Sequence, residues 1–315
     1  MATFLTAQEA AERIPDGATV GLAGMGLSGW PEEVACAIRD RFRETGHPRN
    51  LNLKQGSAMG DWGYGNQFLG WDRTKRPDGP AQDQGNRGVT RFGEAGEGLI
   101  AKWCGAHIGS AFSLNELVRQ NKIQCHCLPQ GVIVNLWREI AAGRPGLLTK
   151  VGLGTFVDPR VEGGKMNQAT TEDLVELVEL GGEEYLFYKS FPLNVALLRG
   201  TTADENGNIT FEHESVLNEG LAVAMAAKNS GGIVIVQVEY VARKGTPSRS
   251  RSPAFWWTMW SRPPTPWPAG RPRGSTLSPP SPVRSKSRCR LCPSCPCRTA
   301  RCSAAAAPWS CALAA

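Results

Sequence analysis

Apolar residues follow two kinds of pattern in the first 244 residues of the chain. Apolar side chains at helical spacing predict helices over residues 9–14, 31–45, 114–121, 132–143 and 215–232. Shorter apolar runs beside glycine or polar residues predict strands over residues 16–24, 50–56, 122–131 (where a loop follows the strand) and 233–241. Strands that alternate with helices predict one α/β domain, in which an open, mostly parallel sheet is flanked by helices.

Local signals mark where three of these helices begin. Thr6 and Glu9 have the spacing of a capping box, in which each side chain bonds a free backbone N–H of the other residue. Ser113 and Glu116 repeat this spacing. Pro31 suits the first turn of a helix, because its missing N–H has no helical partner there. We therefore expect capped helix starts at Thr6 and Ser113, and a helix beginning at Pro31.

Two stretches give weaker signals. In residues 170–200 the many acids favour a helix, but Gly181-Gly182 and the β-rich run 185–191 favour strands, and we predict strands. Residues 56–98 are rich in glycine, aspartate and aromatic residues and show little periodicity. They predict long loops around short elements, an arrangement that often forms a functional surface.

The charge of the chain divides sharply after Lys244. Residues 245–315 contain eleven Arg and Lys and no acid, whereas residues 1–244 contain 24 basic and all 29 acidic residues. The net charge of +6 therefore comes from the C-terminal segment and is no argument for nucleic-acid binding by the domain. We predict an α/β domain over 1–244 and a disordered tail over 245–315.

Cysteine spacing and hydropathy indicate a cytoplasmic compartment. Cys36, Cys104, Cys125 and Cys127 lack the spacing of a disulfide framework, which suits a reducing environment. Residues 1–14 contain no secretory signal pattern, and no apolar run approaches the roughly 20 residues that cross a bilayer. We therefore expect a cytoplasmic protein that does not bind a membrane.

Residues 24–29 form a literal G-x-G-x-x-G between a predicted strand and a predicted helix. Glycines at such a place let backbone amides approach an anionic group. A dinucleotide site also needs an acid at the end of the next strand, but that strand ends in Lys54-Gln55, and Asp40 lies in a helix. NAD binding is therefore the weaker interpretation, and a tight turn that requires positive φ angles is a further one.

The segment around this loop resembles the N-terminal signature of family I CoA-transferases. Asp16-Gly17, an apolar strand, the glycine loop and Gly29-Trp30-Pro31 follow one another in the same order, with Gly24-Met25-Gly26 replacing the usual Gly-Gly-Phe. Residues 128–160 and 198–215 resemble later segments of the family, and residues 156–167 resemble its single-chain propionate/acetate branch. The resemblance extends over about residues 3–244.

The resemblance implies transfer of CoA between a short-chain acyl-CoA and a free carboxylate, as in ketone-body and short-chain fatty acid metabolism. Coenzyme A is a substrate, and neither a cofactor nor a metal is expected. Gln130 falls on the oxyanion-hole glutamine, although without the resemblance it is simply a loop residue that bonds backbone groups. The implied substrate-binding positions are Gly24, Met25, Gly26, Gly29 and Gly131. Intact relatives are expected to be homo-oligomers.

The nucleophile that the family requires has no counterpart in this sequence. In the family a Glu attacks the thioester, and it lies in a Gly-x-Gly-x-Pro-Glu type loop of the second half. This chain has no such motif and no Glu after Glu239. Glu94, Glu97 and Glu162 lie in glycine-rich stretches but do not match the motif, and we interpret them as solvated loop acids. We expect the chain to be inactive by itself.

Three hypotheses account for the tail. It could be a basic arm that binds nucleic acid or a membrane, although five Trp and six Cys are unusual in such an arm. Cys289, Cys292, Cys295 and Cys297 have spacing that suits a zinc or iron–sulfur site, but Pro293 and Pro296 interrupt it. The third hypothesis, which we favour, is translation out of frame.

The genetic code supports the third hypothesis, because Trp and Met have one codon each. Read one base earlier, the codons of residues 254–261 give a small or basic residue, an apolar residue, Leu-Val-Asp, a variable residue and Val, with a second Val if the serine codon is TCN. This is a strand pattern that resembles the family's segment here. Rival functions are a non-catalytic CoA-binding module and a nucleic-acid binder that uses the basic tail.

Overall fold

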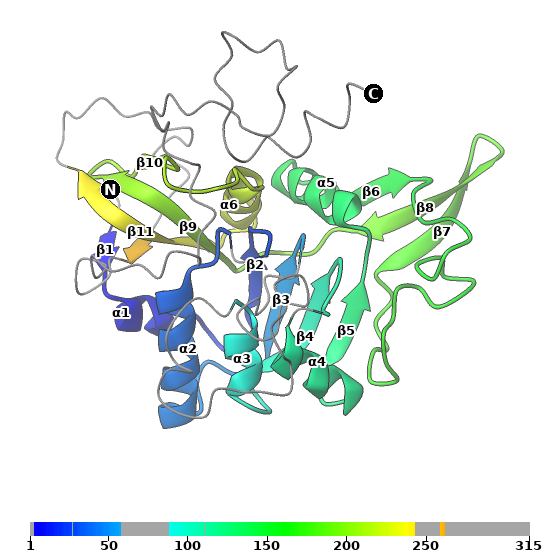
Figure 1. Ribbon diagram of the computed structural model, residues 1–315. Coiled ribbons are helices and arrows are strands. Elements are labelled where there is room, and N and C mark those ends of the chain that lie inside the picture. Colours follow the sequence, from blue (N-terminus) through cyan, green and yellow to red (C-terminus); the bar gives the residue numbers. More distant parts are fainter. Residues whose placement is uncertain (1–2, 27, 58–87, 110, 243–258, 262–315) are drawn as a thin grey trace, which may run out of the picture. The chain divides into compact units, whose positions relative to one another are not determined.

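A largely parallel sheet runs through the middle of the fold, as Figure 1 shows for the computed structural model. The structure describes residues 3–26, 28–57, 88–109, 111–242 and 259–261, which all fall in one compact unit. The strand order is β1-β12-β11-β9-β2-β3-β4-β5, with every neighbouring pair parallel and β10 antiparallel to β9. The strands are β1 Thr3–Leu5, β2 Thr19–Leu22, β3 Leu51–Gln55, β4 Ile100–Gly105, β5 Gln124–Cys127, β9 Val195–Asp204, β10 Ile209–Thr210, β11 Ile233–Ala242 and β12 Met259–Ser261.

Helices cover both faces of this sheet. One face packs against the first four helices and the other against the last two, which contact each other. The helices are α1 Ala7–Glu12, α2 Glu32–Thr45, α3 Thr90–Glu94, α4 Phe112–Arg119, α5 Gln130–Ala141 and α6 Gly220–Asn229. The predicted open, mostly parallel α/β sheet with flanking helices is confirmed.

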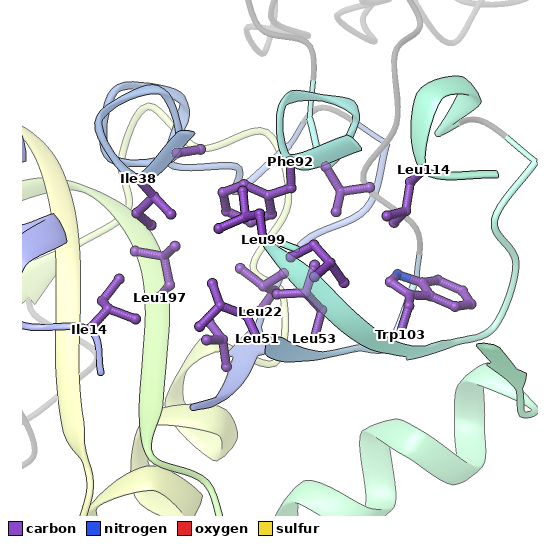
Figure 2. Packing of buried hydrophobic residues seen from close by; sticks show 14 of the residues in the cluster. Ile14, Leu22, Ile38, Leu51, Leu53, Phe92, Leu99, Trp103, Leu114 and Leu197 are labelled. Carbon is purple, nitrogen blue, oxygen red and sulfur yellow. The ribbon is translucent and has the colours of Figure 1, made fainter. Parts of the chain in front are cut away.

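Successive residues of the central strands point to opposite faces, so both faces have an apolar core. In β9, Val195 and Leu197 join the core beneath α1–α4, whereas Ala196 and Leu198 join the core beneath α5 and α6. Figure 2 shows the first core, where Leu197 lies between the sheet and the helices. Its largest fully buried side chains include Trp30, Trp103 and Phe92. This two-sided burial explains why the central strands have nearly continuous apolar sequences.

A small antiparallel sheet extends beyond α5. Its order is β6-β8-β7, formed by Gly146–Thr149, Glu183–Lys189 and Val175–Leu180, and it confirms the strands predicted within 170–200. The loop between β6 and β7 is held by Asp158, which is buried and accepts hydrogen bonds from Gly154 N at 2.8 Å and from Arg160 Nη2 at 2.8 Å. These bonds hold the pKa of Asp158 well below its usual range, with the Arg160 side chain the largest cause.

Helix starts agree with the sequence at one of the two predicted capping boxes. Thr6 and Glu9 form the complete box at α1. The prediction for Ser113 and Glu116 is wrong, because α4 begins at Phe112 with no side-chain cap, and Ser113 Oγ instead donates to Thr90 O at 2.7 Å. Pro31 is the residue before the first turn of α2 rather than part of it.

The segment predicted to be a disordered tail contains a strand of three residues. Met259–Ser261 form β12, which pairs in parallel with β1 on one side and β11 on the other. An extended segment fits there because both neighbours offer unpaired backbone N–H and C=O groups. The boundary predicted at Lys244, the other tail residues and the tail cysteines lie outside the described residues, as does most of the predicted loop region 56–98.

Candidate functional site

The glycine loop, Gln130 and the start of α6 lie at the carboxyl edge of the sheet. The loop follows β2, Gln130 follows β5 after two residues, and α6 begins after the loop that leaves β10. Because parallel strands all end at the same edge, residues distant in sequence meet there, and ligands of open α/β sheets bind at this edge. The substrate-binding and oxyanion-hole residues predicted from the sequence therefore share the carboxyl edge of the sheet.

The glycine loop is a closed turn. Met25 and Ser28 exchange two backbone hydrogen bonds of 3.1 and 3.0 Å, and Gly26 has a φ of 61°, a left-handed conformation that glycine adopts at little cost. Met25 is half exposed, while the Ser28 and Ser215 hydroxyl oxygens lie 2.9 Å apart. The last contact ties the loop to the segment that leads into α6. The loop is thus preformed and presents Met25 to solvent.

Gly29 and Gly131 have different surroundings. A Cβ atom at Gly29 would lie 2.9 Å from Ala23 O and 3.0 Å from Asn218 Nδ2, so the protein itself requires glycine there. A Cβ atom at Gly131 would meet nothing within 4 Å. The space beside Gly131 is therefore open to a ligand, whereas the space beside Gly29 is occupied by the turn before α6.

Gln130 is the first residue of α5, and not a loop residue as the pattern of apolar positions predicts. Its side chain is exposed and makes no hydrogen bond to any residue that the structure describes. The first N–H groups of a helix lack helical partners and carry partial positive charge. The Gln130 amide therefore stands at a place that favours negative charge, with its N–H donors uncommitted.

Glu219 adds a buried carboxyl group to this edge. Its Oε1 atom is buried and, among the residues that the structure describes, has no hydrogen-bond partner. A Cβ atom at Gly56, directly after β3, would lie 2.5 Å from that oxygen and 3.2 Å from Val134 Cγ2. Val134 is one helical turn after Gln130, on the same side of α5. Glu219 thus lies near the same helix face as Gln130, in space that a glycine leaves free.

Burial raises the pKa of Glu219, and a hydrogen bond from its own backbone lowers it to a smaller extent. Near pH 4.5, its ordinary pKa, the unfolded chain begins to release this proton while the folded protein retains it. The contribution of Glu219 to stability is therefore complete at lower pH and is lost as pH rises through its folded pKa.

We expect Glu219→Gln to flatten this pH dependence, because the amide has no proton to release. Urea unfolding of parent and variant at pH 5 and pH 8 measures the effect. The variant should gain stability relative to the parent at pH 8. A difference between the two proteins that is the same at both pH values would contradict the prediction.

The three acids considered as substitutes for the nucleophile lie elsewhere. Glu94 was predicted to be a solvated loop acid, and this prediction is wrong. It is the last residue of α3, and its side chain lies 3.4 Å from each of the buried Arg39 and Arg91 guanidinium groups. Glu97 is exposed and pairs with Lys122 at 2.9 Å, ahead of β4 and β5 and so at the amino edge of the sheet. Glu162 lies in the turns of the loop that precedes β7. None of the three lies at the turn that holds Glu219.

Sequence reasoning missed Asn218, Glu219 and Gln55. Gln55 is fully buried at the end of β3 and donates through Nε2 to Ser57 O at 3.2 Å, whereas its Oε1 has no partner within the described ranges of the chain. The pair Asn218-Glu219 directly before an apolar helix was an available signal, because polar residues that precede a helix after a long loop often face its open N-terminus. Nothing near Gln55 in the sequence distinguishes it from an ordinary strand end.

Other kinds of site are not evident in the described part of the chain. No group of three or more His, Cys, Asp or Glu in those residues could hold a metal ion. Of the helices described, none has both the length and the apolar composition that spanning a bilayer requires. The groups that the structure places at the carboxyl edge include the Gln130 amide, the first backbone N–H groups of α5 and the Glu219 carboxyl.

Comparison with known proteins gives consistent results. A family model described as Coenzyme A transferase matches residues 92–253, just over half of the chain. The chain is 70% identical over 246 residues to the caffeate CoA-transferase of Acetobacterium woodii, covering 78% of this chain and 42% of that protein. It is 38% identical over 257 residues to the acetate CoA-transferase YdiF of Escherichia coli K12, covering 80% and 43%.

A solved structure extends this similarity to three dimensions. The acyl-CoA transferase YdiF of E. coli O157:H7, in a thioester complex with CoA, matches with a TM-score of 0.73 and 34% identity. The match covers 84% of this chain and 47% of that chain. The chain thus spans less than half the length of these relatives, and the part it matches is their α-half. It belongs to the coenzyme A transferase family.

Proposed function

We propose that the chain is the α-half of an enzyme that exchanges CoA between a short-chain or aryl acyl-CoA and a free carboxylate. The 70% identity to a caffeate CoA-transferase over 246 residues carries this proposal. The relatives are named for caffeate and for acetate, so the acid is proposed only as a class. Propionate remains a candidate because residues 156–167 resemble the propionate/acetate branch. We also propose that the protein works in the cytoplasm as an oligomer with no cofactor besides its substrate.

The proposed reaction is a ping-pong exchange. A glutamate carboxylate attacks the carbonyl carbon of the acyl-CoA, the CoA thiolate leaves, and an acyl-glutamyl anhydride forms. The thiolate then attacks the glutamyl carbonyl, releases the first carboxylic acid as its anion and leaves a glutamyl-CoA thioester. The second carboxylate takes the CoA by the same steps in reverse. Each attack places negative charge on a carbonyl oxygen, and we assign Gln130 as a donor to that oxygen.

We further propose that this chain supplies only part of the site. It contains no Glu after Glu239, and the family's nucleophile lies in the second half. The position of β12 supports an out-of-frame tail, because an interior parallel strand usually has a continuous apolar sequence. The earlier frame gives Val in place of Trp260 and, with a TCN codon, Val in place of Ser261, while position 259 becomes Tyr, Asn, His or Asp.

A steady-state assay with propionyl-CoA and acetate tests the proposal. The purified 315-residue chain is expected to show no turnover above background. The control is the frame-restored protein, translated from the same gene after a one-base change that returns the codons after Lys244 to the earlier frame. Robust turnover by the 315-residue chain, or a gene sequence in which neither neighbouring frame encodes a Gly-x-Pro-Glu segment, would show the proposal to be wrong.

Calorimetry with CoA separates the rival of a non-catalytic CoA-binding module. We expect weak binding at best, because the chain offers an open edge rather than an enclosed site. Micromolar binding of CoA by the 315-residue chain without turnover would favour the binding module instead.

A further inference from the structure

A pocket of about 180 Å³ lies beside the glycine loop, between the ends of β2 and β9 and the start of α6. Ala23 and Leu198, both buried, form its floor together with Phe211. Its rim consists of Leu217 and Leu221, which are 51% and 38% exposed, and of Val216. The pocket is therefore lined mainly by apolar side chains, and part of the apolar rim faces solvent.

The charges in the pocket wall are already paired. Arg199 Nε and Nη2 each donate to Glu214 at 2.6 Å, and Arg199 Nη1 donates to Trp30 O at 3.1 Å. This two-pronged pair leaves no net charge to attract an anion. A carboxylate or phosphate inside the pocket would lose its water without gaining an unpaired cation, whereas an uncharged apolar group would lose little.

Asn218 connects the pocket with the Gln130 side of the edge. Asn218 lines the pocket, while the next residue, Glu219, packs towards Gly56 and Val134. The pocket and the face of α5 that carries Gln130 thus lie on the two sides of one short turn. A molecule bound in the pocket that is too long to fit inside it would extend out of the pocket beside the glycine loop and this turn.

We propose that this pocket binds the uncharged, ring-sized part of the acyl substrate, with the carboxyl end directed out past the glycine loop. The assignment to an acyl substrate rests on the proposed function. The volume suits the proposal, because an apolar cavity of about 150 Å³ is enough to hold benzene. An acetyl group would leave most of the pocket empty, so the pocket selects aryl acids over acetate.

Binding of cinnamate to the 315-residue chain tests the proposal. Cinnamate has a phenyl ring and a carboxylate at opposite ends, and ligand-observed NMR titration at pH 7 measures its Kd. We expect saturable binding at least tenfold tighter than that of acetate. In Leu217→Asn/Leu221→Asn the rim becomes polar without added charge, and the Kd should rise at least tenfold. The single variant Leu217→Asn should show a smaller rise in the Kd for cinnamate.

Leu177→Asn/Leu180→Asn is a matched control, because those leucines are 37% and 58% exposed on the distant strand β7. It should change the Kd less than twofold. The proposal is overturned if cinnamate binds no tighter than acetate, or if both rim variants bind cinnamate as tightly as the parent. It is also overturned if the control variant loses as much affinity for cinnamate as the rim double variant. The titration measures binding and needs no turnover. The result of the transferase assay therefore does not decide the result of the titration, and the titration does not decide the assay.

Discussion

Replacing Gln130 with alanine is expected to lower turnover about 10²–10³-fold in the frame-restored protein, the usual cost of one oxyanion donor. Gln130 begins α5 and is exposed, and its side-chain N–H groups bond no residue in the described part of the chain, at a helix end that favours negative charge. Its amide would bind the oxygen of the tetrahedral intermediate more strongly than the neutral carbonyl. Steady-state kinetics should therefore show a fall in kcat with little change in KM.

Gln120→Ala is the control for this experiment, since Gln120 is an exposed glutamine just after α4 whose side-chain Nε2 donates to Glu116 Oε1 at 2.9 Å, one turn earlier in the helix. Its kcat should stay within twofold of the parent value. If Gln130→Ala kept kcat within tenfold, or raised KM alone, Gln130 would be a residue that binds substrate and transition state equally.

Glu214→Ala is expected to lower the free energy of unfolding by about 3–5 kcal/mol, as when one partner of a buried ion pair is removed. The side chains of Arg199 and Glu214 are 16% and 6% exposed. Without Glu214, the Arg199 guanidinium would remain largely out of water, and the Trp30 carbonyl would be its one remaining partner among the described residues. Urea unfolding of the 315-residue chain at pH 7, followed by circular dichroism, measures the loss.

Two controls separate the buried pair from ion pairs in general. Glu176→Ala removes the exposed partner of Lys189, at 2.7 Å, and should cost no more than about 0.5 kcal/mol. Arg199→Met/Glu214→Leu replaces both charges with apolar groups and should recover most of the loss. Equal losses for Glu214→Ala and Glu176→Ala would mean that the pair near the pocket contributes no more than a surface contact.

Much of the fold follows from local patterns in the sequence. Thr6 and Glu9 cap α1 because both partners lie within one turn of chain. Ser113 has the same spacing to Glu116 but bonds Thr90, 23 residues earlier, and no local pattern reveals that partner. Strand β4 has no predicted counterpart, because Lys102 interrupts its short apolar sequence and leaves neither a continuous apolar run nor a regular alternation.

The site was less accessible from sequence than the fold. Gln130 was identified only through the family resemblance, since its own neighbourhood predicts a loop. Gly29 has the pattern of a ligand-binding glycine, yet Asn218, 189 positions later, fills the space beside it. Glu219 has no motif, and its burial depends on the absence of a side chain at Gly56. Such features arise from tertiary contacts, which spacing along the chain does not encode.

The ties between the glycine loop and later segments also constrain the order of assembly during synthesis. Ser28 contacts Ser215, Trp30 accepts from Arg199, and β2 has β9 as a neighbour in the sheet. A ribosome releases the loop almost two hundred residues before these partners. Until β9 and the turn before α6 emerge, β2 is an edge strand with an unsupported loop. The carboxyl edge is therefore among the last parts of the domain to acquire its shape, however early its glycines are made.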